Sequence, residues 1–276
     1  MSSLILRRRA LLAPNRAPPI TGVNWASPQA RGLVAWWPGG VGPLRDLSGR
    51  GHHQTAQSGV QSDKAGPFGA LVKHFNNDGE ITTNNIPDLR GASGATITCW
   101  VVWQEARANY DGLIGTGAGD NNRFTLSVGG PSVGTTSNTA LQVANGSNTY
   151  IYASNNVPNQ NETYFLAGVY DGTQATASDR ANLYTNGLLD SKTVVGTLQA
   201  TLDSNPTNFV IGSEATNASR DHGGRLWDIR VYDRTLSDRE IWEIYAPASR
   251  WDLFAGRGLP SFVPTGGHVP AAIMGL

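Results

Sequence analysis

The sequence predicts an all-β fold: two antiparallel sheets packed as a jelly-roll sandwich, with one short C-terminal helix and an extended arm at each end. Three observations support this prediction. Charged residues make up 15% of the 276 positions, well below the roughly 25% of an average globular protein. The 33 glycines and 15 prolines are spread over the whole chain, which argues against a helical bundle. Between these turn signals lie short apolar or alternating runs, the pattern of strands.

Strands are expected wherever apolar residues alternate with polar ones or form a short continuous run. The segments 95–103 and 163–170 are apolar on both faces, so we expect them to be central strands with both faces covered. Asn186-Gly187 is the strongest hairpin signal, since a type I′ turn needs positive φ at both central residues. In chain order, the expected strands cover residues 32–37, 95–103, 123–128, 163–170, 181–186, 188–194, 208–212 and 225–232.

One short helix is expected after the last strand. Ser237 and Glu240 have the spacing of a capping box, in which the serine hydroxyl accepts from the amide at position 240 and the glutamate reaches back. Pro247 limits the helix to residues 238–245. We expect an apolar stripe to dock the helix on the sandwich, formed by Ile241, Trp242 and Tyr245.

The ends differ in composition from the middle, which predicts an extended basic arm over residues 1–30, a jelly-roll domain over 31–246 and an irregular tail over 247–276. The arm has four arginines and no acidic residue, and the tail combines many prolines and glycines with apolar anchors. The apolar tail is expected to pack either on its own domain or on a neighbour. For binding to neighbouring subunits, the residues proposed are Leu4, Leu6, Arg7, Arg8, Arg9, Leu12, Trp251, Leu253, Phe254 and Phe262.

Charge and targeting signals exclude several classes of protein. Equal numbers of basic and acidic residues, 21 of each, argue against a nucleic-acid binder, and a single cysteine argues against a disulfide scaffold. No run approaches the ~18 apolar residues of a membrane span, so no membrane association is expected. Leu4 and Leu6 precede the arginines, the reverse of the order in a signal peptide, so we expect synthesis in a cytoplasm without a signal peptide.

Several motifs occur in an order that resembles one known family. They are G-L-V-A-W-W at 32–37, D-L-S-G-R-G-H-H at 46–53, V-Y-D-G at 169–172, L-Y-T-N-G at 183–187 and R-V-Y-D-R-T-L-S at 230–237. With these motifs, residues 31–246 resemble the laminin-G-like, concanavalin A-like jelly-roll family, and the resemblance implies its fold. The flanking segments 24–28 and 251–254 are similar to those of bacteriophage-encoded members, which implies a virion structural protein.

From this resemblance we expect a non-enzymatic virion protein, either a capsid decoration or a tail-associated subunit. We expect it to form a homo-oligomer or multi-copy assembly and to be held to other virion proteins by its arms. The alternative is a carbohydrate-binding module for adhesion or receptor binding to surface glycans, with aromatics that stack on sugar rings. The candidates for stacking are Tyr110, Tyr150 and Tyr152.

A glycoside hydrolase is the third hypothesis. Sandwich enzymes that resemble this family have alternating acids on one strand, because two carboxyl groups must flank one bond. The chain has no such triplet, and its only closely spaced glutamates, Glu240 and Glu243, belong to the expected helix. We therefore expect no enzymatic activity.

Calcium is the one cofactor that the resemblance implies, since family members often hold this ion in oxygen-rich loops. The candidate ligands are Asp120, Asn121 and Asp78, and the alternative for each is an ordinary turn role. Trp227 stands where the family often has an acid, which argues against a calcium site. Cys99 lies within an apolar run and is expected to be buried and inert.

Overall fold

The computed structural model describes residue 17 and residues 21–63, 66–70, 72–104, 111–117, 122–128, 138–153, 159–204, 207–214 and 221–255. These residues form a predominantly β structure with one short helix, α2 (Asp238–Tyr245), which confirms the predicted jelly-roll fold class. Short 3-10 turns occur at η1 (Pro28–Ala30), η2 (Pro67–Gly69), η3 (Pro87–Leu89) and η4 (Ala177–Asp179).

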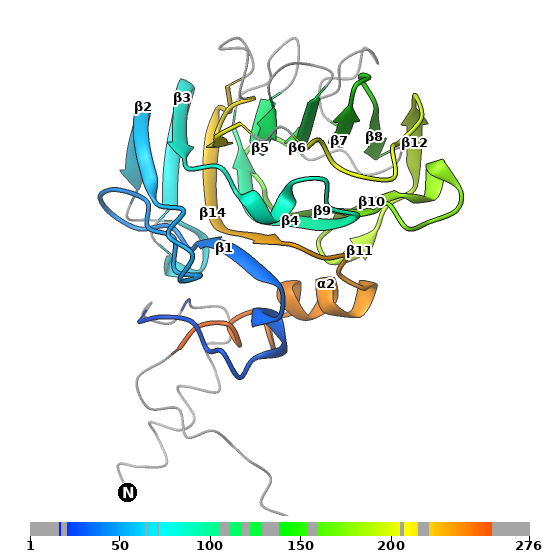
Figure 1. Ribbon diagram of the computed structural model, residues 1–276. Helices are drawn as coiled ribbons and strands as arrows, with labels where there is room; N and C mark the ends of the chain where they lie inside the picture. Colours follow the sequence, from blue (N-terminus) through cyan, green and yellow to red (C-terminus); the bar gives the residue numbers. More distant parts are fainter. Residues whose placement is uncertain are drawn as a thin grey trace, which may run out of the picture.

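The strands form two layers that are connected through one long strand (Figure 1). The lower layer in this view has the order β11-β10-β9-β4-β14, and β1 also pairs with β14. Its strands are β1 (Leu33–Trp37), β4 (Gly94–Trp103), β9 (Thr163–Asp171), β10 (Ala181–Thr185), β11 (Leu188–Leu189) and β14 (Gly224–Tyr232).

The upper layer has the order β13-β5-β6-β7-β8-β12. Its strands are β5 (Asp111–Gly117), β6 (Asn122–Val128), β7 (Thr139–Asn145), β8 (Tyr150–Ala153), β12 (Lys192–Val195) and β13 (Phe209–Ile211). Strand β3 (Val72–Thr83) belongs to both layers, because its first half pairs with β14 and its second half with β13. Strand β2 (Gln54–Asp63) pairs along the other edge of β3.

Two separate hydrophobic clusters stabilise this arrangement. The first fills the space between the sheets, with Ile97 and Cys99 of β4 among its members. The second lies on the outer face of the lower sheet, where Trp100 of β4 packs in the same cluster as Ile241 and Ile244 of α2. Strand β4 pairs with β9 on one side and β14 on the other. This confirms the prediction that residues 95–103 form a central strand covered on both faces.

The Asn186-Gly187 turn has the predicted conformation, with φ of 52° and 79° at its two residues. The prediction of one continuous strand over residues 188–194 is wrong, however. Strand β11 pairs with β10 for only two residues, and the chain then crosses to the other layer, where β12 pairs with β8. The change of sheet between Leu189 and Lys192 depends on pairing partners distant in sequence, which local alternation does not encode.

The segments that flank the jelly roll pair with each other beneath the lower sheet. Val23 and Phe254 form an isolated antiparallel bridge, and the Asn24 amide donates to the Leu253 carbonyl at 2.7 Å. Leu253 and Phe254 are buried in the second hydrophobic cluster. These two side chains were expected to anchor the tail on a neighbouring subunit; they instead pack on their own sandwich, because its outer face is apolar.

A buried ion pair ties both flanking segments to β14. The Arg230 guanidinium donates to both carboxylate oxygens of Asp228, at 3.0 and 2.7 Å, and to the side-chain oxygen of Gln29 at 2.6 Å. Arg230 also donates to the backbone carbonyl of Arg250 at 3.1 Å. The Trp36 indole completes the set with a 2.8 Å bond to Asp228. One buried pair thereby connects β1, β14 and both flanking segments.

The D-x-S-G motif of the resemblance has a structural role. The Asp46 carboxylate accepts from the backbone amides of Trp36, Ser48 and His52 at 2.8–2.9 Å. These bonds satisfy amides of the loop that would otherwise lack a partner. This motif therefore shapes a loop rather than forming a site.

Candidate functional site

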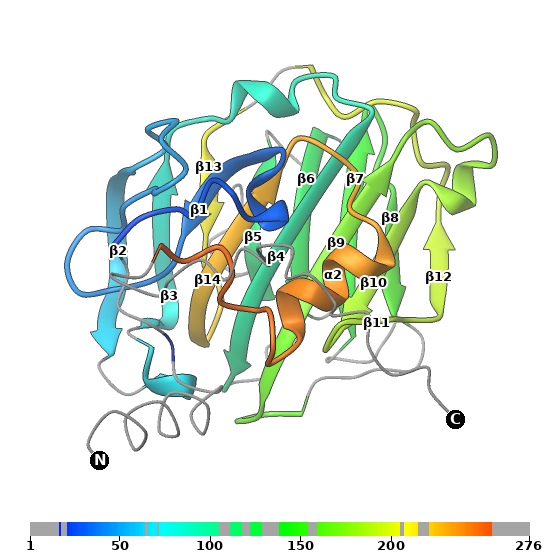
Figure 2. The same cartoon turned by 90° about the horizontal axis from the view of Figure 1, so that it is seen from below.

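A groove of about 450 Å³ lies at the edge of the lower sheet, beside the N-terminal end of α2. Figure 2 shows α2 lying across the outer face of β9 and β10. The groove is lined by side chains from β9, β10, β12, the η4 loop and the start of α2, namely Val169, Asp171, Gln174, Asp179, Asn182, Tyr184, Lys192, Thr235, Leu236, Ser237 and Asp238.

Strand alternation places two polar side chains of β10 on this outer face. Asn182 and Tyr184 are two residues apart and so point to the same side, whereas Ala181 and Leu183 point into the first hydrophobic cluster. The Tyr184 hydroxyl donates to Asp238 at 2.6 Å, linking the sheet to the helix. Burial and this hydrogen bond raise the pKa of Tyr184. The phenol therefore remains a protonated donor at neutral pH.

The opposite wall combines a carboxylate and an ammonium group. Asp171 accepts hydrogen bonds from the Thr173 amide at 3.1 Å and from the Gln174 side chain at 2.6 Å. Burial opposes ionisation of Asp171, but these bonds outweigh it and lower its pKa. Lys192 donates from Nζ to the Ala181 carbonyl at 2.6 Å and to the Asn182 side-chain oxygen at 2.8 Å. Burial lowers the pKa of Lys192, and the charge of Asp179 opposes that effect.

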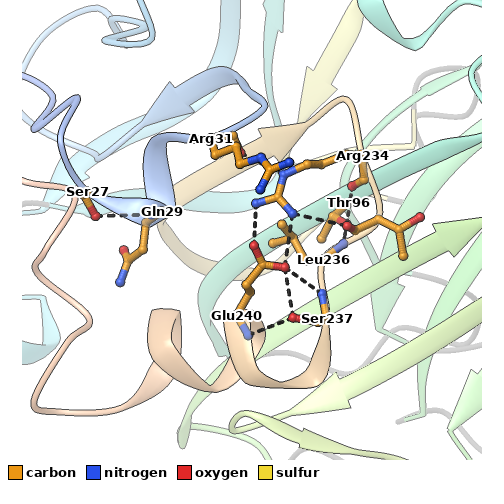
Figure 3. A network of polar contacts seen from close by, with 9 residues as sticks. Ser27, Gln29, Arg31, Thr96, Arg234, Leu236, Ser237 and Glu240 are labelled. Carbon is orange, nitrogen blue, oxygen red and sulfur yellow. Dashed lines mark hydrogen bonds and ion pairs between the residues drawn. The ribbon is translucent and has the colours of Figure 1, made fainter.

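The start of α2, which forms the third wall, is held by a polar network (Figure 3). The predicted capping box is present, with the Ser237 hydroxyl accepting from the Glu240 amide and the Glu240 carboxylate accepting from the Ser237 amide at 2.9 Å. Arg234 donates to both oxygens of Glu240, at 3.1 and 2.7 Å. Thr96 of β4 accepts from the Leu236 amide at 3.2 Å. These contacts fix Ser237 and Asp238 at the rim of the groove.

An exposed tryptophan stands next to the groove. Trp242 lies one helical turn beyond Asp238, on the same side of α2, and is 45% exposed. Leu188 and Leu189 of β11 are exposed beside it, and Leu189 is the pairing partner of Tyr184. Trp242, which was expected to help dock the helix on the sandwich, touches it at the Gly187 turn and stays largely exposed. Ile241, Ile244 and Tyr245 fill that role, because they face the sheet.

The groove therefore has several features of a binding site for a polar ligand. It offers carboxylate oxygens as acceptors and an amide and a hydroxyl group that can exchange hydrogen bonds. The accessible Trp242 indole lies outside its lining, one helical turn from Asp238. The side chains of the groove are positioned by a sheet and a capped helix rather than by loops alone, so little ordering is needed when a ligand binds.

The aromatic residues expected to bind glycans lie elsewhere. Tyr150 and Tyr152 are on β8 of the upper sheet, and their rings are 6.5 Å apart. Tyr150 is only 3% exposed, so its ring has no face free for a sugar, and Tyr152 is half-buried. Tyr110 lies outside the described residues, as do Asp120 and Asn121 of the calcium hypothesis. Asp78 lies in β3, and its side chain is not among those described.

Most of the expected partner-binding residues also fall outside the described part of the chain, namely Leu4, Leu6, Arg7, Arg8, Arg9, Leu12 and Phe262. Of the described ones, Leu253 and Phe254 are buried, and Trp251 is partly buried against Phe68 and Phe254.

Two further findings concern the described residues only. They contain no group of three or more His, Cys, Asp or Glu side chains placed to hold a metal ion. Within the same ranges, no helix is long and apolar enough to cross a membrane.

The sequence did not predict the groove as a binding site, although it predicted local roles for some of the residues that line it. The sequence places Asp171 only within the V-Y-D-G motif, and it predicts Ser237 as a helix cap, which the structure confirms. The groove needs β9, β10, β12 and α2 to meet in space, and no local pattern reports this. The sequence does contain one indication that Trp242 is exposed. Successive residues of a helix are about 100° apart around its axis, so Ile241 and Trp242 cannot both face the sheet directly.

Comparison with known proteins supports the fold described above. A family model described as the Concanavalin A-like lectin/glucanases superfamily matches residues 75–242, more than half of the chain. No curated protein matches the sequence.

Several solved structures share the fold at low sequence identity. The binding domain of Paraclostridial Mosquitocidal Protein 1 aligns at 18% identity and a TM-score of 0.60, over 79% of this chain and 52% of that one. The botulinum neurotoxin serotype C1 binding domain aligns at 13% identity and a TM-score of 0.59, with the same coverage. This chain thus spans about half the length of these toxin domains.

A third structure is matched over nearly its full length. Domain 4 of AbnA, an extracellular arabinanase from Geobacillus stearothermophilus, was solved in complex with arabinotriose. It aligns at 16% identity and a TM-score of 0.58, over 77% of this chain and 98% of that one. With the match of residues 75–242, the predicted resemblance is confirmed at the level of the fold family: the chain belongs to the laminin-G-like domains of the concanavalin A-like lectin/glucanase superfamily.

Proposed function

We propose that this protein is a carbohydrate-binding domain without enzymatic activity, and that its sugar ligand binds in the groove between β10 and the start of α2. The observation on which the proposal chiefly rests is the combination of a polar groove with the exposed Trp242, which lies one helical turn from Asp238 in the groove lining. Sugars have the matching chemistry, because their hydroxyl groups donate and accept hydrogen bonds while their ring faces are apolar and pack on aromatic rings.

The groove provides partners for both kinds of sugar contact. Asp238 accepts from Tyr184 through one oxygen, and its other oxygen can accept from a sugar hydroxyl. Asn182 contributes an amide that can both donate and accept. Trp242 supplies the ring on which an apolar sugar face can stack.

The proposed absence of enzymatic activity is supported by the contacts of Glu240 and Glu243, the two glutamates that are closest in sequence. Glu240 is held by Arg234 and by the capping box, and Glu243 pairs with Arg239 at 2.9 Å. Both carboxylates therefore stabilise α2. A pair of free carboxyl groups flanking a sugar bond, which glycoside hydrolysis needs, is not offered by these residues.

The relatives are consistent with sugar binding. The matched family is named for lectins and glucanases, and the AbnA domain was crystallised with a trisaccharide. At the identities observed, these proteins support the proposal as analogues of the fold only.

The experiment is a glycan-array screen followed by calorimetric titration of any glycan that binds. Trp242→Ala should weaken binding at least about tenfold, which corresponds to 1.4 kcal/mol. Trp25→Ala is the matched control, since Trp25 is also exposed but lies in the segment before β1 and not on α2 beside Asp238. The proposal is wrong if no glycan binds at millimolar concentration, or if Trp242→Ala binds as tightly as the unmodified protein.

Attachment to a virion stays a prediction. Its basis is the basic arm and the apolar tail, whose described anchors Leu253 and Phe254 pack on their own chain. The test should therefore remove only residues 1–16 or 256–276, which leaves the paired flanking segments intact. We expect reduced incorporation into purified particles, and full incorporation of both truncated proteins would contradict the hypothesis.

A further inference from the structure

The charges around the groove indicate which sugars it accepts. Three aspartates line it, Asp171, Asp179 and Asp238, against a single ammonium group, that of Lys192. Aspartate carries a negative charge at neutral pH and lysine a positive one, so the lining has a formal charge of −2. A ligand that enters the groove approaches within a few ångströms of this charge, where screening by solvent ions is weakest.

The ammonium group of Lys192 is not available to attract an anionic ligand. Lys192 already donates to the Ala181 carbonyl and the Asn182 side chain, and the negative charge of Asp179 acts on it and partly offsets the lowering of its pKa by burial. Arg180 flanks the groove, but its guanidinium donates to the carbonyls of Gln174 and Leu198 at 3.0 and 2.8 Å. Both cations are therefore engaged by the protein's own acceptors.

Resting on the proposed function, we propose that the groove selects by charge: it binds uncharged sugars and sugars with a free amino group, and it excludes sialic and uronic acids. An uncharged sugar hydroxyl donates to the aspartates, and an ammonium group adds an attractive charge. A sugar carboxylate would instead meet two or more like charges, an arrangement that opposes binding.

The test is an array with neutral glycans, the sialylated and uronic acid forms of the same backbones, and deacetylated amino-sugar oligomers. We expect the bound set to contain neutral or amino-sugar glycans, with each acidic counterpart bound at least about tenfold more weakly. Because the discrimination is electrostatic, it should shrink when NaCl is raised from about 0.05 to 0.5 M.

A charge variant tests the cause. Asp179 is exposed, and Asp179→Asn removes one negative charge from the groove. The substitution should reduce the gap, that is, the ratio of the affinity for a neutral glycan to that for its acidic counterpart, by about threefold. Asp233→Asn is the matched control, because Asp233 is also an exposed aspartate but does not line the groove. It should leave the gap unchanged.

The outcomes separate the two proposals. Acidic glycans that bind as tightly as their neutral parents, with binding lost in Trp242→Ala, would overturn charge selection and leave carbohydrate binding standing. An array without any bound glycan, or binding unaffected by Trp242→Ala, would overturn the carbohydrate-binding function and charge selection with it.

Discussion

The substitution Asp228→Asn, which breaks the buried ion pair of Asp228 and Arg230, should destabilise the protein. Asp228 is 2% exposed and accepts from three donors, the Trp36 indole and two nitrogens of Arg230. Arg230 is fully buried; burial disfavours its charge, but Asp228 outweighs this and raises its pKa. Asparagine keeps the shape and tolerates the positive φ of 46° at this position. The change therefore removes the negative charge and replaces one of the two accepting oxygens with a donor nitrogen, which cannot accept from Trp36 or Arg230.

Removing one partner of a buried ion pair leaves the other charge uncompensated and costs about 3–5 kcal/mol. For a domain of this size, that lowers the melting temperature by about 6–20 °C. Urea unfolding followed by tryptophan fluorescence measures the loss directly.

The control is Asp88→Asn, which breaks the Arg50–Asp88 pair, whose side chains are 46% and 25% exposed. We expect it to cost less than about 1 kcal/mol, as exposed pairs do. If Asp228→Asn destabilises the protein no more than Asp88→Asn, the flanking segments are not held by this network.

Three further outcomes follow from the structure. Gly187→Ala should destabilise the protein by about 1–3 kcal/mol in the same urea assay, because φ is 79° and a Cβ would lie 2.9 Å from Trp242. Arg234 holds the pKa of Glu240 at about 2, so the stability that this pair provides is complete above about pH 4.5 and lost as the pH falls towards 2. After discounting for solvent screening we expect about 1 kcal/mol, and Glu240→Gln should abolish that part of the pH dependence of unfolding. Cys99 is fully buried, and its pKa is raised mainly by burial and to a smaller extent by the charge of Asp228. Thiol reagents should therefore label it only in denaturant.

Local patterns predicted the elements whose cause is local. The capping box and the Asn186-Gly187 turn form as expected, since each depends on atoms within a few residues. The two-faced strand over residues 95–103 was also predictable, because its composition reports that both faces are buried.

Long-range pairing was decided by the tertiary structure alone. The chain leaves one sheet after Leu189 and enters the other at Lys192, and the tail residues Leu253 and Phe254 turn back onto their own sandwich. Alternation of residues gives a strand's two faces but not its neighbours, and the apolar residues of a tail do not specify which apolar surface they cover.

The candidate site shows the same division. The sequence by itself determined the fold class, the family and the helix that ends in front of Pro247. Only the tertiary structure decided that Asp171, Asp179 and Tyr184 face Asp238 across one groove, with Trp242 exposed beside it. The physical reason is that secondary structure follows from interactions within a few residues, whereas a groove is a product of sheet register and helix docking.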